Sequence, residues 1–182
     1  MFRRANELFL QKLRLSKPWR YKAPFLISIP YLFILLGQIS PQDSVLAIAM
    51  SCCTIFGIAG LGYSLNDLSD REEDRKAGKF NLFLRLGTPG TMALMLLFGG
   101  MAVLPWIFYF PRGWSTLGLL GIELLLFMLY SLPPFRFKER GWWGVLCDAG
   151  YAHAVPAVLA ALTFFYLGNR QFDQLWPFVL LL

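Results

Sequence analysis

Hydrophobic residues in this chain are grouped into long stretches, separated by short polar connections. Crossing a bilayer as a helix takes about 20 residues, and five stretches are long enough: 24–40, 43–64, 91–110, 115–132 and 142–167. A sixth begins near Leu175 and stops at Leu182, which is too short to cross. The pattern predicts an all-α fold over residues 1–182, a single polytopic transmembrane helix bundle with about five complete spans and the start of a sixth.

The composition agrees with a membrane protein. Hydrophobic residues make up 57% of the chain, aromatic residues 16% and charged residues only 15%, whereas soluble domains carry about 25% charged residues. The mean hydropathy is +0.52. We therefore expect an integral, multi-pass membrane protein that is embedded in the lipid bilayer.

The net charge of +6 is explained by where the basic residues lie. Of the 17 Lys and Arg residues, seven fall within 1–22, five within 71–85 and three within 136–140, and the other two are Arg112 and Arg170. Counting spans, the three groups lie on one side of the membrane and the two single residues on the other. Because basic residues collect in cytoplasmic loops, we expect the amino terminus and all three groups to be cytoplasmic, at the cell inner membrane or its equivalent. This distribution gives no sign of a nucleic-acid site.

Residues 1–22 mix seven basic side chains with hydrophobic ones such as Phe2, Phe9 and Leu13. Such a mixture is typical of a helix that lies in the membrane interface over anionic lipid. We interpret it as a basic interfacial segment that is retained in the protein. The simplest role for it is an anchor.

Three glycines in the second stretch are spaced along one helix, at Gly57, Gly60 and Gly62. Small residues let membrane helices approach each other closely. We expect this helix to pack tightly against its neighbours.

The densest group of acidic side chains follows the second stretch. If the helix continues at about 100° per residue, Asn66, Asp70 and Asp74 fall at roughly 0°, 40° and 80°, and Asp67 at roughly 100°. One helix face then carries three carboxylates and an amide, and the carboxylates repel one another unless a cation binds. Oxygen ligands of this kind suit Mg²⁺, whose remaining positions phosphate oxygens can fill. The simpler alternative is a solvated acidic loop between two membrane helices.

Two basic segments are predicted on the same side of the membrane as this acidic face. After Asp74 the chain can fold back and bring Lys79 toward the carboxylates. Between the fourth and fifth stretches, Pro133-Pro134 favours an extended chain. Its basic side chains would then alternate onto one side, namely Arg136, Lys138 and Arg140. Cations beside a Mg²⁺ site are what a diphosphate requires, so we predict an anion site; the alternative is that these residues only satisfy membrane charge asymmetry.

Other polar side chains lie within the predicted spans. Glu123 is near the middle of the fourth, and an ionisable group at that depth is a functional candidate by default, although we keep it outside the predicted site. The fifth carries Asp148, Tyr151 and His153. Asp148 is close enough to the cytoplasmic end to reach the loop cations. A lone histidine in a packed helix is more typical of a structural hydrogen bond than of catalysis.

The order Asn66-Asp67-x-x-Asp70-x-x-x-Asp74, where a second transmembrane helix leaves the membrane, resembles the first aspartate motif of the UbiA-like intramembrane prenyltransferases. The loop Tyr130-Ser131-x-Pro133-Pro134-x-Arg136-x-Lys138 is similar to the basic loop between the fourth and fifth helices of that family. Together the two motifs span most of the chain. The resemblance implies a bundle of about nine helices around a central cavity, of which this chain is the first part.

The same resemblance implies roles for particular residues. Asn66, Asp70 and Asp74 would hold Mg²⁺ and through it a prenyl diphosphate, with Asp67, Asp70 and Asp74 as the catalytic carboxylates. Four further side chains would contact the diphosphate: Lys79, Tyr130, Arg136 and Lys138. The implied reaction is transfer of a prenyl group to an electron-rich, aromatic acceptor within the membrane, as in quinone biosynthesis. Mg²⁺ and the cations stabilise the leaving diphosphate, and the acceptor attacks the allylic carbocation.

The second aspartate motif of the family would follow only after Leu182. We therefore expect this chain to be an amino-terminal portion or a truncated product that does not catalyse alone. Two other hypotheses stay open. A truncated, inactive homologue would bind lipid, a cation or a partner chain. A cation transporter would use Asp67, Asp70 and Asp74 as an entrance, but Glu123 is its only polar candidate in mid-span.

Overall fold

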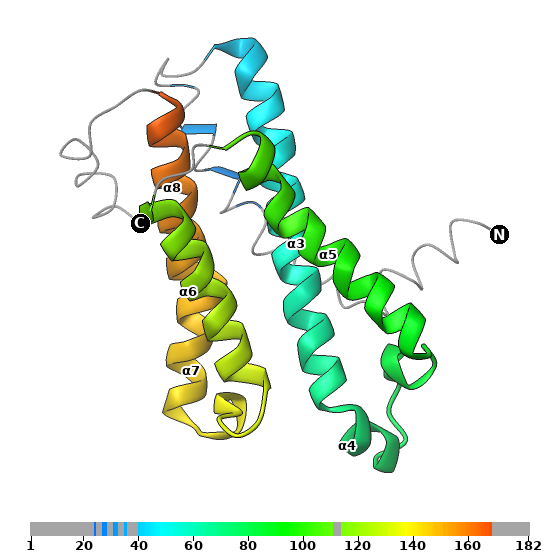
Figure 1. The fold of residues 1–182 in the computed structure, drawn as a ribbon. Helices are drawn as coiled ribbons and strands as arrows, with labels where there is room; N and C mark the ends of the chain where they lie inside the picture. Colours follow the sequence, from blue (N-terminus) through cyan, green and yellow to red (C-terminus); the bar gives the residue numbers. More distant parts are fainter. Residues whose placement is uncertain are drawn as a thin grey trace.

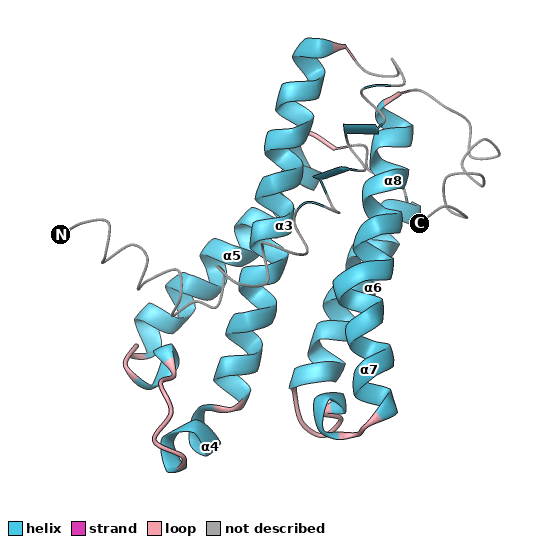
Figure 2. Ribbon diagram, turned by 180° about the vertical axis from the view of Figure 1, so that it is seen from behind, coloured by secondary structure: helices cyan, strands magenta, loops and turns pink. Residues whose placement is uncertain are grey.

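Figure 1 shows the chain in a computed structural model, which describes residues 40–110 and 114–168 together with positions 24, 27, 28, 31, 32 and 35. Every regular element of this described part is a helix, as predicted (Figure 2). Three expectations lie outside the described residues. They are the interfacial segment 1–22, most of the first span at 24–40 and the start of the sixth span near Leu175.

The described helices are α3 (Pro41–Ser69), α4 (Arg71–Lys76), α5 (Thr88–Phe108), α6 (Trp114–Ser131), α7 (Trp142–Ala149) and α8 (Val155–Leu167). Short helical turns join them, namely the 3-10 turns η1 (Leu82–Leu84) and η2 (Phe137–Glu139) and the π-helical turn η3 (Gly150–Ala154). The start of α3 has clear sequence signals. Pro41 suits the first turn of a helix, and the Ser40 hydroxyl accepts a hydrogen bond from the Asp43 N–H at 3.1 Å.

Four helical segments of the described part are long and apolar enough to cross a membrane: Gln42–Ser69, Thr88–Phe108, Trp114–Ser131 and Trp142–Leu167. They correspond to the second, third, fourth and fifth predicted spans. The last of them consists of α7, η3 and α8 in succession. The first continues to Ser69 rather than ending at residue 64, so Asn66 and Asp67 lie within the helix.

The helices form two groups that lie side by side (Figure 1). α3 and α5 share the most extensive contact, whereas α6 packs against α7, η3 and α8. α3 also contacts α6 and so joins the groups. At the end of the bundle where α4 lies, the Ser69 hydroxyl donates a hydrogen bond to the Ser131 carbonyl oxygen at 2.6 Å. The acidic segment and the loop between α6 and α7 therefore lie at the same end, as predicted.

The glycines of α3 lie where other helices approach closely, which confirms their predicted packing role; they are Gly57, Gly60 and Gly62. A methyl group at Gly57 would lie 2.2 Å from the backbone nitrogen of Ala102 in α5. One at Gly62 would lie 2.1 Å from the ring of Phe127 in α6. Glycine at these positions therefore sets the distance from α3 to both neighbours.

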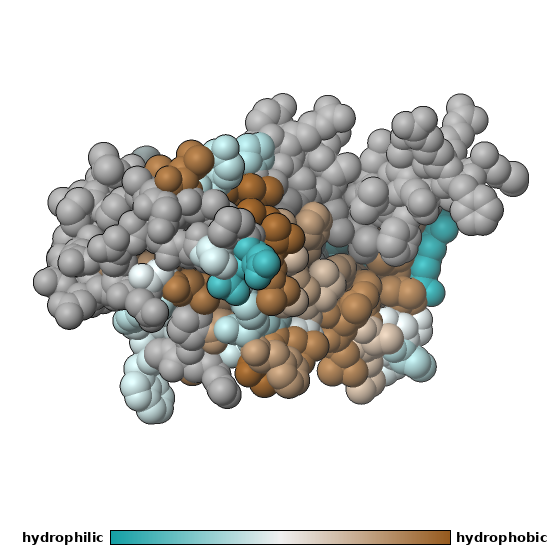
Figure 3. Space-filling model, turned by 90° about the horizontal axis from the view of Figure 1, so that it is seen from above, coloured by the Kyte–Doolittle hydropathy of each residue, from teal (hydrophilic) through white to brown (hydrophobic). Residues whose placement is uncertain are grey.

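Buried hydrophobic side chains form two clusters. One joins the first half of α3 to α8 through Ala47, Ala161 and Phe164, and the other joins α3, α5, α6 and α8 around Trp106 and Phe127. Large hydrophobic residues are also exposed on the outside, including Leu96, Phe108 and Trp114. Figure 3 shows hydrophobic residues over much of the described surface seen from above. An apolar exterior of this extent suits contact with lipid.

Candidate functional site

The acidic segment is divided by a bend at Asp70. α3 ends at Ser69, Asp70 has φ −89° and ψ 2°, and α4 begins at Arg71. Backbone hydrogen bonds continue across the bend, from the Asp70 N–H to the Asn66 oxygen at 2.9 Å and from the Asp74 N–H to the Asp70 oxygen at 2.8 Å. The chain nevertheless changes direction here (Figure 1), so the single straight helix that we expected is wrong.

The loop between α6 and α7 is not the extended segment that we predicted. The Pro133-Pro134 peptide bond is cis, and Arg136 has a φ of 38°, which is uncommon for a residue other than glycine. The turn η2 follows directly. Arg140 turns back and donates a hydrogen bond to the Pro134 oxygen at 2.8 Å, with its guanidinium over the Phe137 ring. The predicted alternation is therefore wrong for Arg140, whereas the other two cations reach the acidic segment.

Arg136 and Lys138 meet Asn66 and Asp70 at the end of α3. The Lys138 ammonium forms an ion pair with the Asp70 carboxylate and donates a hydrogen bond to the Asn66 Oδ1 atom at 3.0 Å. The Arg136 guanidinium pairs with the same carboxylate at 2.9 Å. Asn66 donates from Nδ2 to the Asp70 Oδ2 atom at 3.3 Å. The fold thus brings together four predicted site residues from two distant segments.

Two carboxylates that the sequence analysis did not include complete the group around Arg136. The guanidinium lies 2.8 Å from the Glu73 Oε1 atom and 2.6 Å from the Glu139 Oε1 atom. Its hydrogen bond holds the pKa of exposed Glu73 below the usual value, and the same bond raises the pKa of Arg136. Three carboxylates around two cations leave one net negative charge. We call this group the ionic cluster: Asn66, Asp70, Glu73, Arg136, Lys138 and Glu139.

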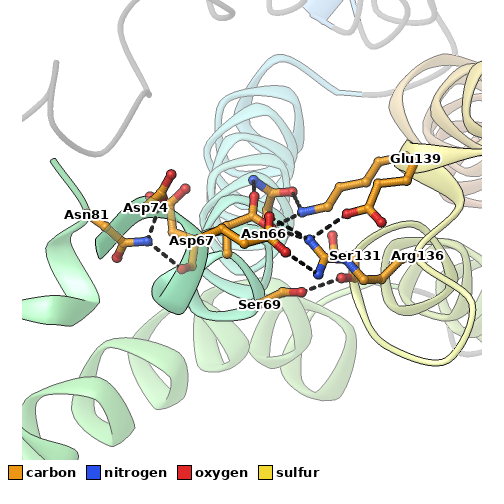
Figure 4. Close-up of polar contacts among 11 residues, drawn as sticks. Asn66, Asp67, Ser69, Asp74, Asn81, Ser131, Arg136 and Glu139 are labelled. Atoms are coloured by element: carbon orange, nitrogen blue, oxygen red, sulfur yellow. Dashed lines mark hydrogen bonds and ion pairs between the residues drawn. The ribbon is translucent and has the colours of Figure 1, made fainter. Parts of the chain in front are cut away.

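Asp67 and Asp74 lie on the other side of the helix end, away from Arg136 (Figure 4). The Asn81 side chain donates from Nδ2 to the Asp74 Oδ2 atom at 2.9 Å and to the Asp67 backbone oxygen at 2.6 Å. Its Oδ1 atom accepts from the Phe83 N–H at 2.9 Å. Asn81, which the sequence analysis missed, therefore ties the turn after α4 to the end of α3.

The bend consequently separates the three predicted Mg²⁺ ligands. Asn66 and Asp70 belong to the ionic cluster, and Asp74 is bonded to Asn81 instead. Lys79 is exposed, and its backbone N–H is bonded to the Asp74 oxygen at 2.9 Å. Among the interactions of the described residues, none brings the Lys79 side chain into the ionic cluster.

A cavity of about 320 Å³ lies inside the bundle next to the ionic cluster. α3 lines it from Asn66 to Ser51, which corresponds to about 22 Å along the helix. Tyr130, a predicted site residue, and Tyr151 lie in its wall with ring centroids 5.2 Å apart. Tyr151 belongs to the π-helical turn and is hydrogen-bonded to Asp148. π-Helical turns often occur at functional sites, and this one places a polar aromatic side chain in the cavity.

A Mg²⁺ ion shared by Asn66 and Asp70 stays a prediction, because Lys138 contacts an oxygen of each side chain in this structure and would have to give way to the ion. The two side chains are adjacent, and Mg²⁺ is commonly held by one or two carboxylates together with phosphate oxygens and water. In residues 40–110 and 114–168, no three His, Cys, Asp or Glu side chains are grouped to hold a metal ion. The remaining ligands of such an ion would therefore come from a bound phosphate or water.

No protein-family model, characterised protein or solved structure matches this chain. The resemblance to the UbiA-like family stays a prediction from two motifs. The features that bear on function are therefore the ionic cluster and the cavity beside it.

Proposed function

We propose that this protein serves Mg²⁺-dependent prenyl transfer, in which a prenyl group passes from a prenyl diphosphate to an electron-rich acceptor in the membrane. The observation that supports this function best is the position of the ionic cluster. Lys138, Arg136, Asp70 and Asn66 meet beside a cavity whose walls are mainly apolar and aromatic. A prenyl diphosphate has the matching division, because its head is highly charged and its chain is hydrophobic.

The ionic cluster contains the groups that a diphosphate head requires. Asp70 and Asn66 would hold Mg²⁺, and the bound ion would stabilise the charge of the leaving diphosphate. Lys138 and Arg136 would exchange the Asp70 carboxylate for phosphate oxygens, to which charge-assisted hydrogen bonds are strong. The planar guanidinium can bind two phosphate oxygens at once, whereas the ammonium acts as a point charge.

Aromatic rings in the cavity wall suit the second part of the reaction. Phe127 and Tyr151 pack with centroids 4.2 Å apart, and Tyr130 contacts Tyr151. The face of an aromatic ring attracts a cation by about 0.5–2 kcal/mol. These three side chains would therefore stabilise an allylic carbocation and keep away the water that would quench it.

The ion pairs also favour a second candidate, a catalytically inactive membrane protein. Asp70 is already paired with two cations, so the ionic cluster could serve only to fasten the end of α3 to the loop before α7. The two candidates differ in what the Asp70 carboxylate does. In the first it supports Mg²⁺-dependent ligand binding, and in the second it supports folding alone.

Isothermal titration of farnesyl diphosphate into the purified protein in detergent, with and without Mg²⁺, tests the proposal. Asp70→Asn should weaken Mg²⁺-dependent binding at least about tenfold. Glu72→Gln is the matched control, because Glu72 lies on the exposed side of α4 and pairs with Arg75. Wild-type protein without Mg²⁺-dependent affinity, or Asp70→Asn with undiminished affinity, would count against prenyl diphosphate binding and favour the inactive protein.

A further inference from the structure

Three polar side chains lie in the cavity wall far from the ionic cluster. Thr54 on α3, Trp106 on α5 and Glu123 on α6 are 5%, 3% and 2% exposed. Along the helix axes, Thr54 is about 18 Å from Asn66 and Glu123 about 12 Å from Ser131. Thr54 and Glu123 therefore lie well inside their helices, and Trp106 lies in the last turn of α5.

Each of them has a polar atom without a hydrogen-bond partner among the described residues: Thr54 Oγ1, Trp106 Nε1 and Glu123 Oε2. A buried polar atom that is left unpaired costs about 1–3 kcal/mol. Thr163, in the same cavity wall, shows the ordinary solution, because its hydroxyl donates to the Leu159 oxygen at 2.6 Å. Ser131, which lines the cavity beside the ionic cluster, has a fourth unpaired atom, Oγ. The three unpaired groups away from the ionic cluster indicate an occupant that supplies the missing partners.

The three side chains line the same cavity. Trp106 also belongs to the buried cluster that contains Ile58 and Leu120. Ile58 is one helical turn from Thr54, and Leu120 is three residues from Glu123, so each pair shares a helix face. Three helices therefore each contribute one polar group to the wall of this cavity.

The hydrogen-bonding capacities of these groups select a hydroxyl as the best partner. The Trp106 N–H can only donate, and the Thr54 hydroxyl can donate or accept. The Glu123 Oε2 atom accepts when the carboxyl is ionised and can also donate when it is protonated, and a hydroxyl partner suits either form. A hydroxyl that donates to Glu123 and accepts from Trp106 satisfies both, with an oxygen lone pair left for Thr54. An ammonium leaves the indole N–H unpaired, and an apolar chain satisfies none of the three. The surrounding walls contain Phe110 and Phe127, so the rest of the ligand is hydrophobic.

We propose that this end of the cavity binds a membrane-soluble molecule through its hydroxyl group, which Thr54, Trp106 and Glu123 hold. A phenol and a long-chain alcohol share this chemistry. Binding requires neither Mg²⁺ nor a diphosphate, so the site goes beyond the proposed prenyl transfer and does not depend on it.

The test compares three probes of similar size, para-heptylphenol, decanol and heptylbenzene, by titration into the purified protein in detergent without Mg²⁺. We expect at least one hydroxyl probe to bind about tenfold more tightly than heptylbenzene, because only the hydroxyl pairs with the buried groups. Tighter binding of the phenol identifies an aromatic ligand, and tighter binding of decanol identifies an aliphatic alcohol. Equal affinity for all three probes overturns the proposal.

Variants then locate the hydroxyl. Thr54→Val and Trp106→Phe each remove one polar atom with little change in shape, and each should weaken the better hydroxyl probe about threefold to tenfold without affecting heptylbenzene. The exposed residues Thr88 and Trp114 provide matched controls, Thr88→Val and Trp114→Phe. If neither Thr54→Val nor Trp106→Phe weakens the binding of the hydroxyl probe, the buried polar atoms are hydrogen-bonded to water alone. The proposal would then be wrong.

Discussion

Lys138 and Asp70 form an ion pair that joins the loop before α7 to the end of α3, across 68 positions of the sequence. Their side chains are 13% and 21% exposed, so water screens the pair only in part. Because Lys138 also holds Asn66, a single ammonium group contacts both residues that we assign to Mg²⁺. In the proposed function a diphosphate would therefore compete with Asp70 for Lys138, and its binding would act on a contact that also joins two parts of the fold.

Replacing Lys138 separates its role from that of Lys79. Lys138→Ala should weaken Mg²⁺-dependent farnesyl diphosphate binding at least about tenfold, because a charge-assisted bond to phosphate is lost. Lys79→Ala should change the affinity less than about twofold, since Lys79 is exposed and outside the ionic cluster. Titration calorimetry measures both. Similar losses in the two variants would show that Lys79 reaches the ligand after all, as the motif resemblance implies.

Acid should loosen the ionic cluster through Glu73. Arg136 depresses the folded-state pKa of Glu73 below the usual 4.5. A carboxyl with a lower pKa in the folded state contributes stability above the unfolded pKa, and this contribution is lost as the pH falls through the folded value. Denaturant unfolding should therefore show the wild type losing stability more steeply below about pH 4.5 than Glu73→Gln. Glu72→Gln should show the same dependence of stability on pH as the wild type. If the stability of Glu73→Gln also falls in parallel with that of the wild type, Arg136 does not stabilise the ionised form of Glu73.

Close packing of α3 on α5 should make Gly57 intolerant of even a methyl group. Gly57→Ala should lower the free energy of unfolding by about 1–3 kcal/mol, because the backbone of α5 must move. Gly118→Ala is the control, since a methyl group there meets no atom within 4 Å among the described residues. It should be neutral or stabilise α6 by up to about 1 kcal/mol. Unfolding in mixed detergent micelles measures the free energy of unfolding of both variants. Equal losses in Gly57→Ala and Gly118→Ala would contradict the close approach of α3 to α5.

Asn81 should matter for stability and Asp74 little for ligand binding. Asn81→Ala removes three hydrogen bonds made by a buried side chain, and we expect a loss of about 2–4 kcal/mol in the free energy of unfolding. Asp74→Asn keeps an oxygen for Asn81, and its Mg²⁺-dependent farnesyl diphosphate affinity should stay within about threefold of wild type. A large loss of affinity in Asp74→Asn would instead support Asp74 as a Mg²⁺ ligand.

Features that repeat along the sequence could be predicted from it. The four described spans follow from the length of the hydrophobic stretches, and the α3 contacts from the spacing of Gly57, Gly60 and Gly62. The sequence predicted Lys138 and Asp70 on the same side of the membrane, but not their ion pair. The distribution of basic residues indicates on which side a loop lies, and it does not indicate which residue a side chain contacts.

Features that depend on distant contacts could not be predicted. Helical periodicity placed Asp74 beside Asp70, but the bend and the hydrogen bond from Asn81 turn it away. The positive φ of Arg136 likewise replaces the extended loop that Pro133-Pro134 suggested. Glu73 offered a local signal, because it lies three residues after Asp70 and so faces the same side of a helix.

Photolabelling with a prenyl diphosphate whose chain carries a diazirine tests whether the ionic cluster and the cavity bind a prenyl diphosphate. We expect cross-links, mapped by mass spectrometry, on cavity residues of α3 and α8, such as Ile58 and Leu159. Labelling should require Mg²⁺, compete with unlabelled farnesyl diphosphate and be lost in Asp70→Asn. Labelling spread over exposed residues of α5 such as Leu96, and indifferent to Mg²⁺ and competitor, would contradict binding at the ionic cluster.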